Sequence, residues 1–257
     1  MADKQRRASE LAADHTAEAI AARLEDGGVR HPYLRDAILG AIDGCVTTFA
    51  VVAGVVGADL PVSAIVVLGM ANLLADGFSM AASDFQGIRA ERQVYERERW
   101  IEESHVVQIP EGEREEVRQI FARKGLAGDD LDQVVRIMTA DRQRWVETML
   151  DLEKGLLLHG PSPWRAALTT FVAFAVAGLA PLLIFLYDLV APGQVASAFM
   201  WSALLTGVTF FAIGATKSLV VNQPWYLAGL ETLAVGGTAA VIAFAVGLGL
   251  KQVGIAG

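Results

Sequence analysis

The stretch VSAIVVLGMANLLADGFSMAASDFQGIRAERQVYERERWIEESHVV, residues 62–107, changes composition at its middle. Up to Phe85 it is mostly apolar, and beyond Phe85 glutamates alternate with arginines. At about 1.5 Å rise per residue, a helix over the apolar half is long enough for the roughly 30 Å hydrocarbon thickness of a membrane. We therefore predict a membrane-spanning helix that continues past the membrane to about Val107.

Four further long apolar segments accompany the span at 62–85. Their predicted limits are 37–58, 166–187, 195–215 and 225–250. Short polar turns or proline breaks separate neighbouring segments, which is typical of consecutive membrane-spanning helices. The chain is also 53% hydrophobic with a positive mean hydropathy. These features predict an all-α membrane protein with five transmembrane helices.

A polar, carboxylate-rich insert at 87–163 separates the second span from the third. We predict three helices in it: the continuation of span two, a second helix over 110–124, and a third over 131–154 with a break near 139–141. A further helix is expected over 9–24 in the N-terminal arm. The predicted domains are a cytoplasmic arm (1–34), spans one and two (35–86), a cytoplasmic acidic metal-binding domain (87–163) and spans three to five (164–257).

The basic residues predict the orientation in the membrane. Of 21 lysines and arginines, 13 lie between Arg89 and Arg165, and the turns around Asp59 and Pro192 carry none. By the positive-inside rule, the arm and the insert are cytoplasmic. The first 30 residues are polar, so we expect no cleaved signal peptide and a plasma (inner) membrane location. The net charge of −8 argues against nucleic acid as a partner.

Carboxylates inside the spans are the first candidates for function, because a charged group is costly in the membrane. Asp43 lies in span one, seven residues after Asp36. Span two carries polar or thioether side chains at intervals of four residues, which form one stripe on the helix: Asn72, Asp76, Met80 and Asp84. Carboxylates with one thioether indicate a pathway for a divalent cation such as Fe(II). The alternative is hydrogen bonding between helices without transport.

Span five contains a further carboxylate, Glu231, which we interpret either as a proton site or as the partner of a polar group on another helix. The candidate pathway residues are therefore Asp36, Asp43, Asp76, Met80 and Glu231.

The insert offers several potential metal ligands at helical spacing. Glu98, Glu102 and His105 share one helix face, and two further pairs are three or four residues apart. Helices that each supply two or three donors can surround metal ions. The alternative is a solvated acidic surface, since arginines interleave with the acids. The candidate ligands are Glu98, Glu102, His105, Glu113, Glu116, Met149 and Glu153.

Several motifs resemble the vacuolar iron transporter family. They are RDAILGAIDG at 35–44, ADG at 75–77, SMA at 79–81, IPEGE at 109–113, WVETM at 145–149 and EKGL at 153–156. The motifs, the spans and the insert follow one another in the order typical of that family. The likeness covers the chain from about Arg35 onward.

The resemblance implies a homodimer of five-span subunits that exports Fe(II), and related ions such as Mn(II), in exchange for protons. It implies that Asp43 and Met80 line the pathway at the dimer interface. It also implies a metal site in the insert formed by glutamates and a methionine: Glu102, Glu113, Glu116, Met149 and Glu153. His105 stands where a glutamate is usual and Leu150 where a second methionine is usual. These departures imply fewer bound ions or a different preferred metal.

The sequence thus predicts a divalent-metal/proton antiporter, not an enzyme, without a cofactor. Its expected partners are divalent metal ions, protons, membrane lipid and a second copy of the chain. The rival interpretation is a membrane-anchored metal sensor or buffer, whose spans have no need for carboxylates. A ferritin-like oxidase is a third, but it needs paired Glu-x-x-His motifs and the insert has one, at 102–105.

Overall fold

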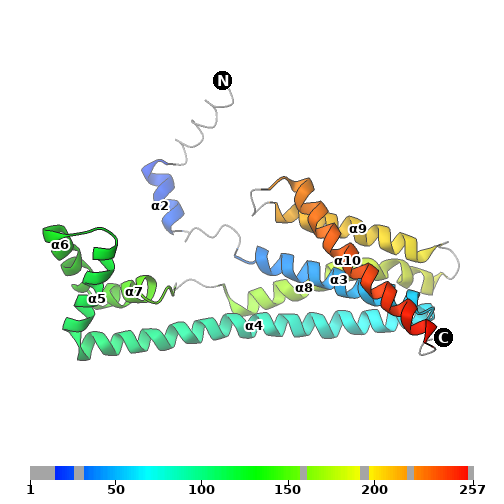
Figure 1. Cartoon of the computed structure of the whole chain (residues 1–257), viewed down its shortest axis with the longest axis horizontal. Helices are drawn as coiled ribbons and strands as arrows, with labels where there is room; N and C mark the ends of the chain where they lie inside the picture. The colour runs from blue at the N-terminus through cyan, green and yellow to red at the C-terminus, as the bar shows by residue number, and fades with distance from the viewer. Residues whose placement is uncertain (1–14, 26–31, 157–160, 192–196, 219–222, 254–257) are drawn as a thin grey trace, which may run out of the picture. The chain divides into compact units, whose positions relative to one another are not determined.

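The computed structural model describes residues 15–25, 32–156, 161–191, 197–218 and 223–253, and every regular element in these ranges is a helix (Figure 1). The elements are α2 (Ala17–Glu25), α3 (Leu34–Gly57), α4 (Val62–Gln108), α5 (Pro110–Arg123), α6 (Gly128–Thr139), α7 (Arg142–Leu152), α8 (Pro163–Val190), α9 (Ala198–Lys217) and α10 (Trp225–Gln252). Helix α2 covers the second half of the helix expected in the arm, and residues 1–14 lie outside the described ranges.

Five of these helices are long and apolar enough to cross a membrane: α3, α4, α8, α9 and α10. The prediction of five spans is confirmed on length and composition. Helix α4 has 47 residues and continues without interruption from the apolar half of the opening stretch into the polar half. Pro181 lies inside α8 without ending it, and Pro163 occupies the first turn, where its missing N–H is not needed.

The chain forms two compact units. One, the membrane unit, comprises the residues up to Asp84 and from Trp164 onward, and the other, the insert unit, comprises Phe85–Pro163. Helix α4 supplies its first half to the membrane unit and its second half to the insert unit.

Glycines allow the helices of the membrane unit to approach closely. Gly40 and Gly44 of α3 face the backbone of α8, and a Cβ on Gly44 would lie 2.8 Å from Cα of Phe174. At the other end of α3, Gly57 meets α10, where it approaches the backbone of Phe244. Helix α10 accordingly packs along α3 (Figure 1). This close packing stabilises the geometry of α3, the helix that carries Asp36 and Asp43.

The insert unit has its own apolar core. Val117 of α5 and Val146, Met149 and Leu150 of α7 are almost completely buried in it. The predicted third helix of the insert is divided into α6 and α7 at the break expected near 139–141, so the count of three helices is not confirmed. Helix α6 ends at Thr139, and Asp141 caps α7 by accepting a hydrogen bond from the backbone N–H of Arg144 at 2.9 Å. An N-cap of this kind begins a new helix because it satisfies donors in the first turn.

Candidate metal centre and intramembrane acids

Three side chains of the insert unit meet at the junction of α4 and α5. Glu102 and His105 are one turn apart on α4, and Glu113 lies in the first turn of α5. One ligand atom from each of the three lies within 4.8 Å of the others. His105 Nδ1 is 3.2 Å from Glu113 Oε1. The chain turns at Ile109-Pro110, and the contact with His105 places Glu113 beside the end of α4. We call Glu102, His105 and Glu113 the carboxylate–histidine cluster.

Both carboxylates of this cluster are buried, with 1% of each residue exposed. The Oε2 atom of Glu102 and the Oε2 atom of Glu113 have no hydrogen-bond partner among the described residues. Buried carboxylate oxygens without partners are unfavourable, and a bound cation relieves this cost. Two carboxylates and one imidazole are a donor set suited to borderline divalent metals such as Fe(II). The cluster therefore has the chemistry of a metal centre.

The carboxylates also repel one another. Burial, followed by the charges of Glu102 and Glu116, raises the pKa of Glu113 from 4.5 to about 7, and His105 opposes this rise. Glu153 adds to the repulsion of Glu113. Glu116 and Glu153 are thus close enough to act on the cluster electrostatically, although neither is one of its three members.

Lys154 is the counter-ion of this acidic group. Its Nζ lies 2.9 Å from Glu153 Oε1 and 3.5 Å from Glu102 Oε1. The hydrogen bond with Glu153 is the main cause of the raised pKa of Lys154. We did not predict this role, although the position of Lys154 directly after Glu153 was a signal for it. In the metal-free protein, the ammonium group supplies part of the positive charge that a metal ion would bring.

Two predicted ligands of the insert lie elsewhere. Met149 is completely buried in the apolar core of the insert unit, beside Trp145 and Leu150. Glu98 lies one turn before Glu102 on α4 and is partly exposed. A ligand role for either residue stays a prediction.

In the membrane unit, polar side chains of α3 and α4 face one another. The carboxylates of Asp43 and Asp76 lie close enough to interact electrostatically. One turn along each helix, Asn72 Nδ2 donates to Thr47 Oγ1 at 3.4 Å. The Thr47 hydroxyl in turn donates to the backbone oxygen of Asp43 at 2.8 Å. The predicted polar stripe of span two therefore meets the polar positions of span one.

A second acidic pair lies about two turns away along the same interface. Asp36 is 7% exposed, and its Oδ2 has no hydrogen-bond partner among the described residues. The Asp84 carboxylate interacts with Asp36 electrostatically and accepts a hydrogen bond from Thr170 Oγ1 of α8 at 2.8 Å. Met80 lies on α4 one turn from Asp84 and one turn from Asp76. Two pairs of acids and a thioether thus follow the α3–α4 interface.

Glu231 is 59% exposed at its side chain and lies on α10, away from this sequence of acids. Lys217 Nζ of α9 is 3.3 Å from its Oε2. We considered Glu231 either as a proton site or as the partner of a polar group on another helix. The contact with Lys217 favours the second role. Lys217 lies at the end of α9, so this ion pair joins α9 to α10.

The fold and these two groups of side chains define a multi-pass integral membrane protein whose donors suit divalent cations. Comparison with known proteins gives the family. The sequence profile of the VIT family matches residues 34–248, and the chain belongs to this family.

The relatives are named as transporters rather than as enzymes. The vacuolar iron transporter of Toxoplasma gondii is 35% identical over 228 residues, which cover 86% of this chain and 75% of the relative. Vacuolar iron transporter 1 of Eucalyptus grandis is 30% identical over 82% of this chain and 84% of its own length. Vacuolar iron transporter 1 of Arabidopsis thaliana is also 30% identical, over 82% of this chain and 83% of its own length. In such proteins the iron is cargo, not a cofactor.

Proposed function

We propose that this protein moves Fe(II), and also Mn(II) and related divalent ions, out of the cytoplasm in exchange for protons. One observation supports this most strongly: the carboxylates of Asp43 and Asp76, on two apolar helices, lie close enough to interact electrostatically. Paired acids inside membrane spans are costly, and a pathway for cations gives them a function that an anchor does not need.

The order of donors along α3 and α4 supports a stepwise path. Asp36 and Asp84 would receive the ion first, Met80 would contact it next, and Asp43 with Asp76 would bind it deeper in the membrane. Carboxylate oxygens hold divalent ions, and the thioether favours Fe(II) over Mg(II) and Ca(II). As the ion leaves, the same carboxylates can take up protons, which gives a physical basis for exchange. The absence of a Walker motif from the sequence agrees with a gradient as the energy source.

The insert unit would collect metal for this path. The two carboxylates of its carboxylate–histidine cluster are buried, and each has an oxygen that lacks a partner among the described residues. The imidazole of His105 in place of the usual glutamate shifts the donor set toward borderline metals. We therefore expect the insert to prefer Fe(II), Co(II) or Zn(II) over Ca(II).

The orientation that we propose places the arm and the insert in the cytoplasm. The basic residues near the span ends, Arg35, Arg89 and Arg165, support it through the positive-inside rule. The relatives are named vacuolar, so the expected plasma membrane location gains no support from them. In either membrane, the proposed direction of transport is away from the cytoplasm. The homodimer implied by the family resemblance belongs to the same proposal.

Transport assays in liposomes test this function. The protein is reconstituted, Fe(II), Mn(II), Co(II), Zn(II) and Ca(II) are offered in turn, and internal metal and internal pH are followed together. We expect Fe(II) uptake with an opposite proton movement and little Ca(II) uptake. A protein that binds Fe(II) at the insert but gives no flux above that of empty liposomes would instead be a membrane-anchored buffer or sensor.

A further inference from the structure

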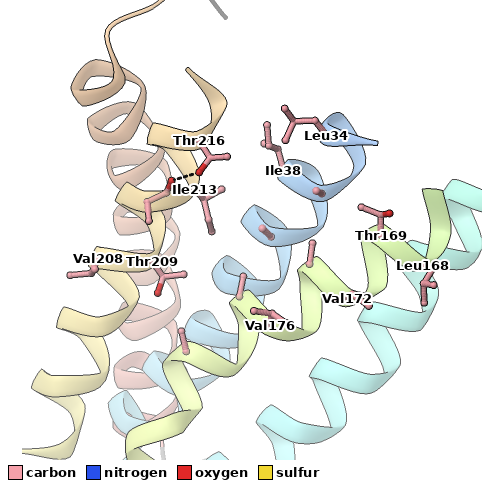
Figure 2. Close-up of a pocket in the computed structure, with 16 residues that line it drawn as sticks. Leu34, Ile38, Leu168, Thr169, Val172, Val176, Val208, Thr209, Ile213 and Thr216 are labelled. Carbon is pink, nitrogen blue, oxygen red and sulfur yellow. Dashed lines mark hydrogen bonds between the residues drawn. The ribbon is translucent and has the colours of Figure 1, made fainter. Parts of the chain in front are cut away.

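A large groove opens between α3, α8 and α9, within the membrane unit. Its volume is about 820 Å³, and 16 residues line it. Figure 2 shows Leu34 and Ile38 entering it from α3, Val172 and Val176 from α8, and Ile213 from α9. The volume falls in the range of about 300–1,000 Å³ that is usual for ligand sites. None of the acids of the proposed pathway lines this groove.

The lining of the groove is suited to hydrocarbon. Apart from three threonines, every lining residue is Leu, Ile, Val or Ala. The hydroxyls of Thr169, Thr209 and Thr216 donate to backbone oxygens of their own helices at 2.8, 2.9 and 2.9 Å. These hydroxyls therefore need no polar ligand. An apolar chain is the occupant that this surface favours.

One end of the groove carries basic residues on all three helices. The start of α3, the start of α8 and the end of α9 meet at this end, because Leu34, Leu168 and Thr216 line the same groove. The basic residues are Arg35, Arg165 and Lys217. Each lies within one turn of a lining residue on its own helix: Arg35 is three residues before Ile38, Arg165 is three and four residues before Leu168 and Thr169, and Lys217 is four residues after Ile213.

The charges at this end are only partly compensated. Arg35 and Arg165 are exposed, and Lys217 pairs with Glu231 at 3.3 Å. Buried Asp36 interacts both with Arg35 and with the partly buried Asp84. At the opposite end of the spans, the basic residue among the described ones is Lys251, and its Nζ lies 2.7 Å from Asp59 Oδ2. The positive end of the groove is therefore a local feature.

We propose that this groove binds an anionic phospholipid. One acyl chain lies along the aliphatic lining between α3, α8 and α9, and the phosphate lies between Arg35, Arg165 and Lys217. Basic pockets between membrane-spanning helices bind anionic head groups in this way. The site goes beyond the proposed transport function and does not depend on it, because no residue of the pathway or of the carboxylate–histidine cluster lines it.

Native mass spectrometry of the full-length protein in detergent tests the proposal. The protein is titrated with phosphatidylglycerol and, separately, with phosphatidylcholine of the same acyl chains. We expect phosphatidylglycerol to be retained preferentially. In the double variant Arg165→Gln/Lys217→Gln, the ratio of retained phosphatidylglycerol to retained phosphatidylcholine should fall by about fivefold or more for each charge removed. Lys251→Gln is the matched control, because it removes a basic residue at the other end of the spans, and its lipid retention should equal that of the wild type.

A second variant tests the binding of the acyl chain separately from the binding of the phosphate. Val172→Trp places a large side chain in the groove, and we expect it to reduce retention of both lipids while Arg35, Arg165 and Lys217 are intact. Equal retention of the two lipids by the wild type would overturn the proposal. Unchanged preference in the double variant would also overturn it. Dissociation of a dimer by Val172→Trp, without any change in lipid retention, would assign the groove to a second copy of the chain instead.

Discussion

His105 Nδ1 of α4 lies 3.2 Å from Glu113 Oε1 of α5 and joins the end of one helix to the start of the next. This contact brings an imidazole and two buried carboxylates together, since Glu102 is one turn before His105. It is also where this chain departs from the glutamate that its family resemblance leads us to expect at His105. The first predictions therefore concern this cluster.

Metal binding to the insert should strengthen as the pH rises through neutrality. Burial and neighbouring carboxylates raise the pKa of Glu113 to about 7, so below this pH its proton competes with the metal. One competing proton lowers the affinity by about tenfold per pH unit below 7. Isothermal titration calorimetry of Co(II) binding to the purified protein, at several pH values between 5 and 8, measures how the affinity changes with pH.

Glu113→Gln should weaken binding at pH 8 and remove the part of the slope that Glu113 causes. Glu111→Gln is the matched control, because Glu111 is on the same helix, is 85% exposed at its side chain and pairs with Arg114. The control should bind metal as the wild type does. An unchanged slope in Glu113→Gln would show that another group titrates in this range.

The same carboxyl group should lower the stability of the metal-free insert at high pH. A raised pKa means that folding favours protonated Glu113, so its contribution to stability is fully present below about pH 4.5 and is lost as the pH rises through about 7. Metal-free Glu113→Gln should therefore be more stable than the wild type at pH 8, on the order of 2 kcal/mol. Thermal unfolding at pH 4 and pH 8 measures the difference, which should nearly vanish at pH 4.

Lys154 should compete with the metal. Its ammonium group lies 3.5 Å from Glu102 Oε1, one of the oxygens available to an ion. Lys154→Met removes this charge, so we expect metal affinity at pH 8 to rise by about tenfold and metal-free stability to fall by about 1 kcal/mol. Lys124→Met, which changes a lysine whose Nζ lies 6.0 Å from the Phe121 ring, is the control. A fall in affinity in Lys154→Met would mean that Lys154 orders the cluster instead of competing.

Close packing of α3 on α8 should make Gly44 intolerant of a side chain. A Cβ there would lie 2.8 Å from Cα of Phe174, and backbone atoms cannot move aside as side chains do. Gly44→Ala should therefore cost about 1–3 kcal/mol. At Gly54 the nearest atom, the backbone oxygen of Ala243, would be 3.6 Å from the new Cβ, so Gly54→Ala should be nearly neutral. The melting temperatures of the two variants in detergent should differ clearly, and equal values would contradict the packing at Gly44.

The spans could be predicted from the sequence because each is a long apolar segment, and the limits of α3 and α10 differ from prediction by a few residues. The continuation of α4 was also predictable, since its polar half keeps strong helix formers. The break near 139–141 that the sequence predicts is where α6 ends and α7 begins, and the N-cap residue Asp141 marks it.

The contacts within the cluster could not be predicted in the same way. Spacing placed Glu102 and His105 on one helix face, but the approach of Glu113 depends on how the chain turns at Ile109-Pro110. The contact of Lys154 with Glu102 joins residues 52 positions apart and depends on the packing of the insert core. The pairing of Asp84 with Thr170 likewise depends on how α8 packs, and periodicity along one helix carries no information on its neighbour.

Coupled flux through Asp43 tests the central claim most directly. Wild type and Asp43→Asn are reconstituted in liposomes, and Fe(II) entry and internal pH are recorded in the same experiment, with Asp59→Asn as the control for an exposed acid at a span end. We expect Asp43→Asn to abolish both Fe(II) entry and the proton movement while the insert still binds metal, and Asp59→Asn to transport as the wild type does. Fe(II)-driven proton flux that is unchanged in Asp43→Asn would contradict the proposed pathway.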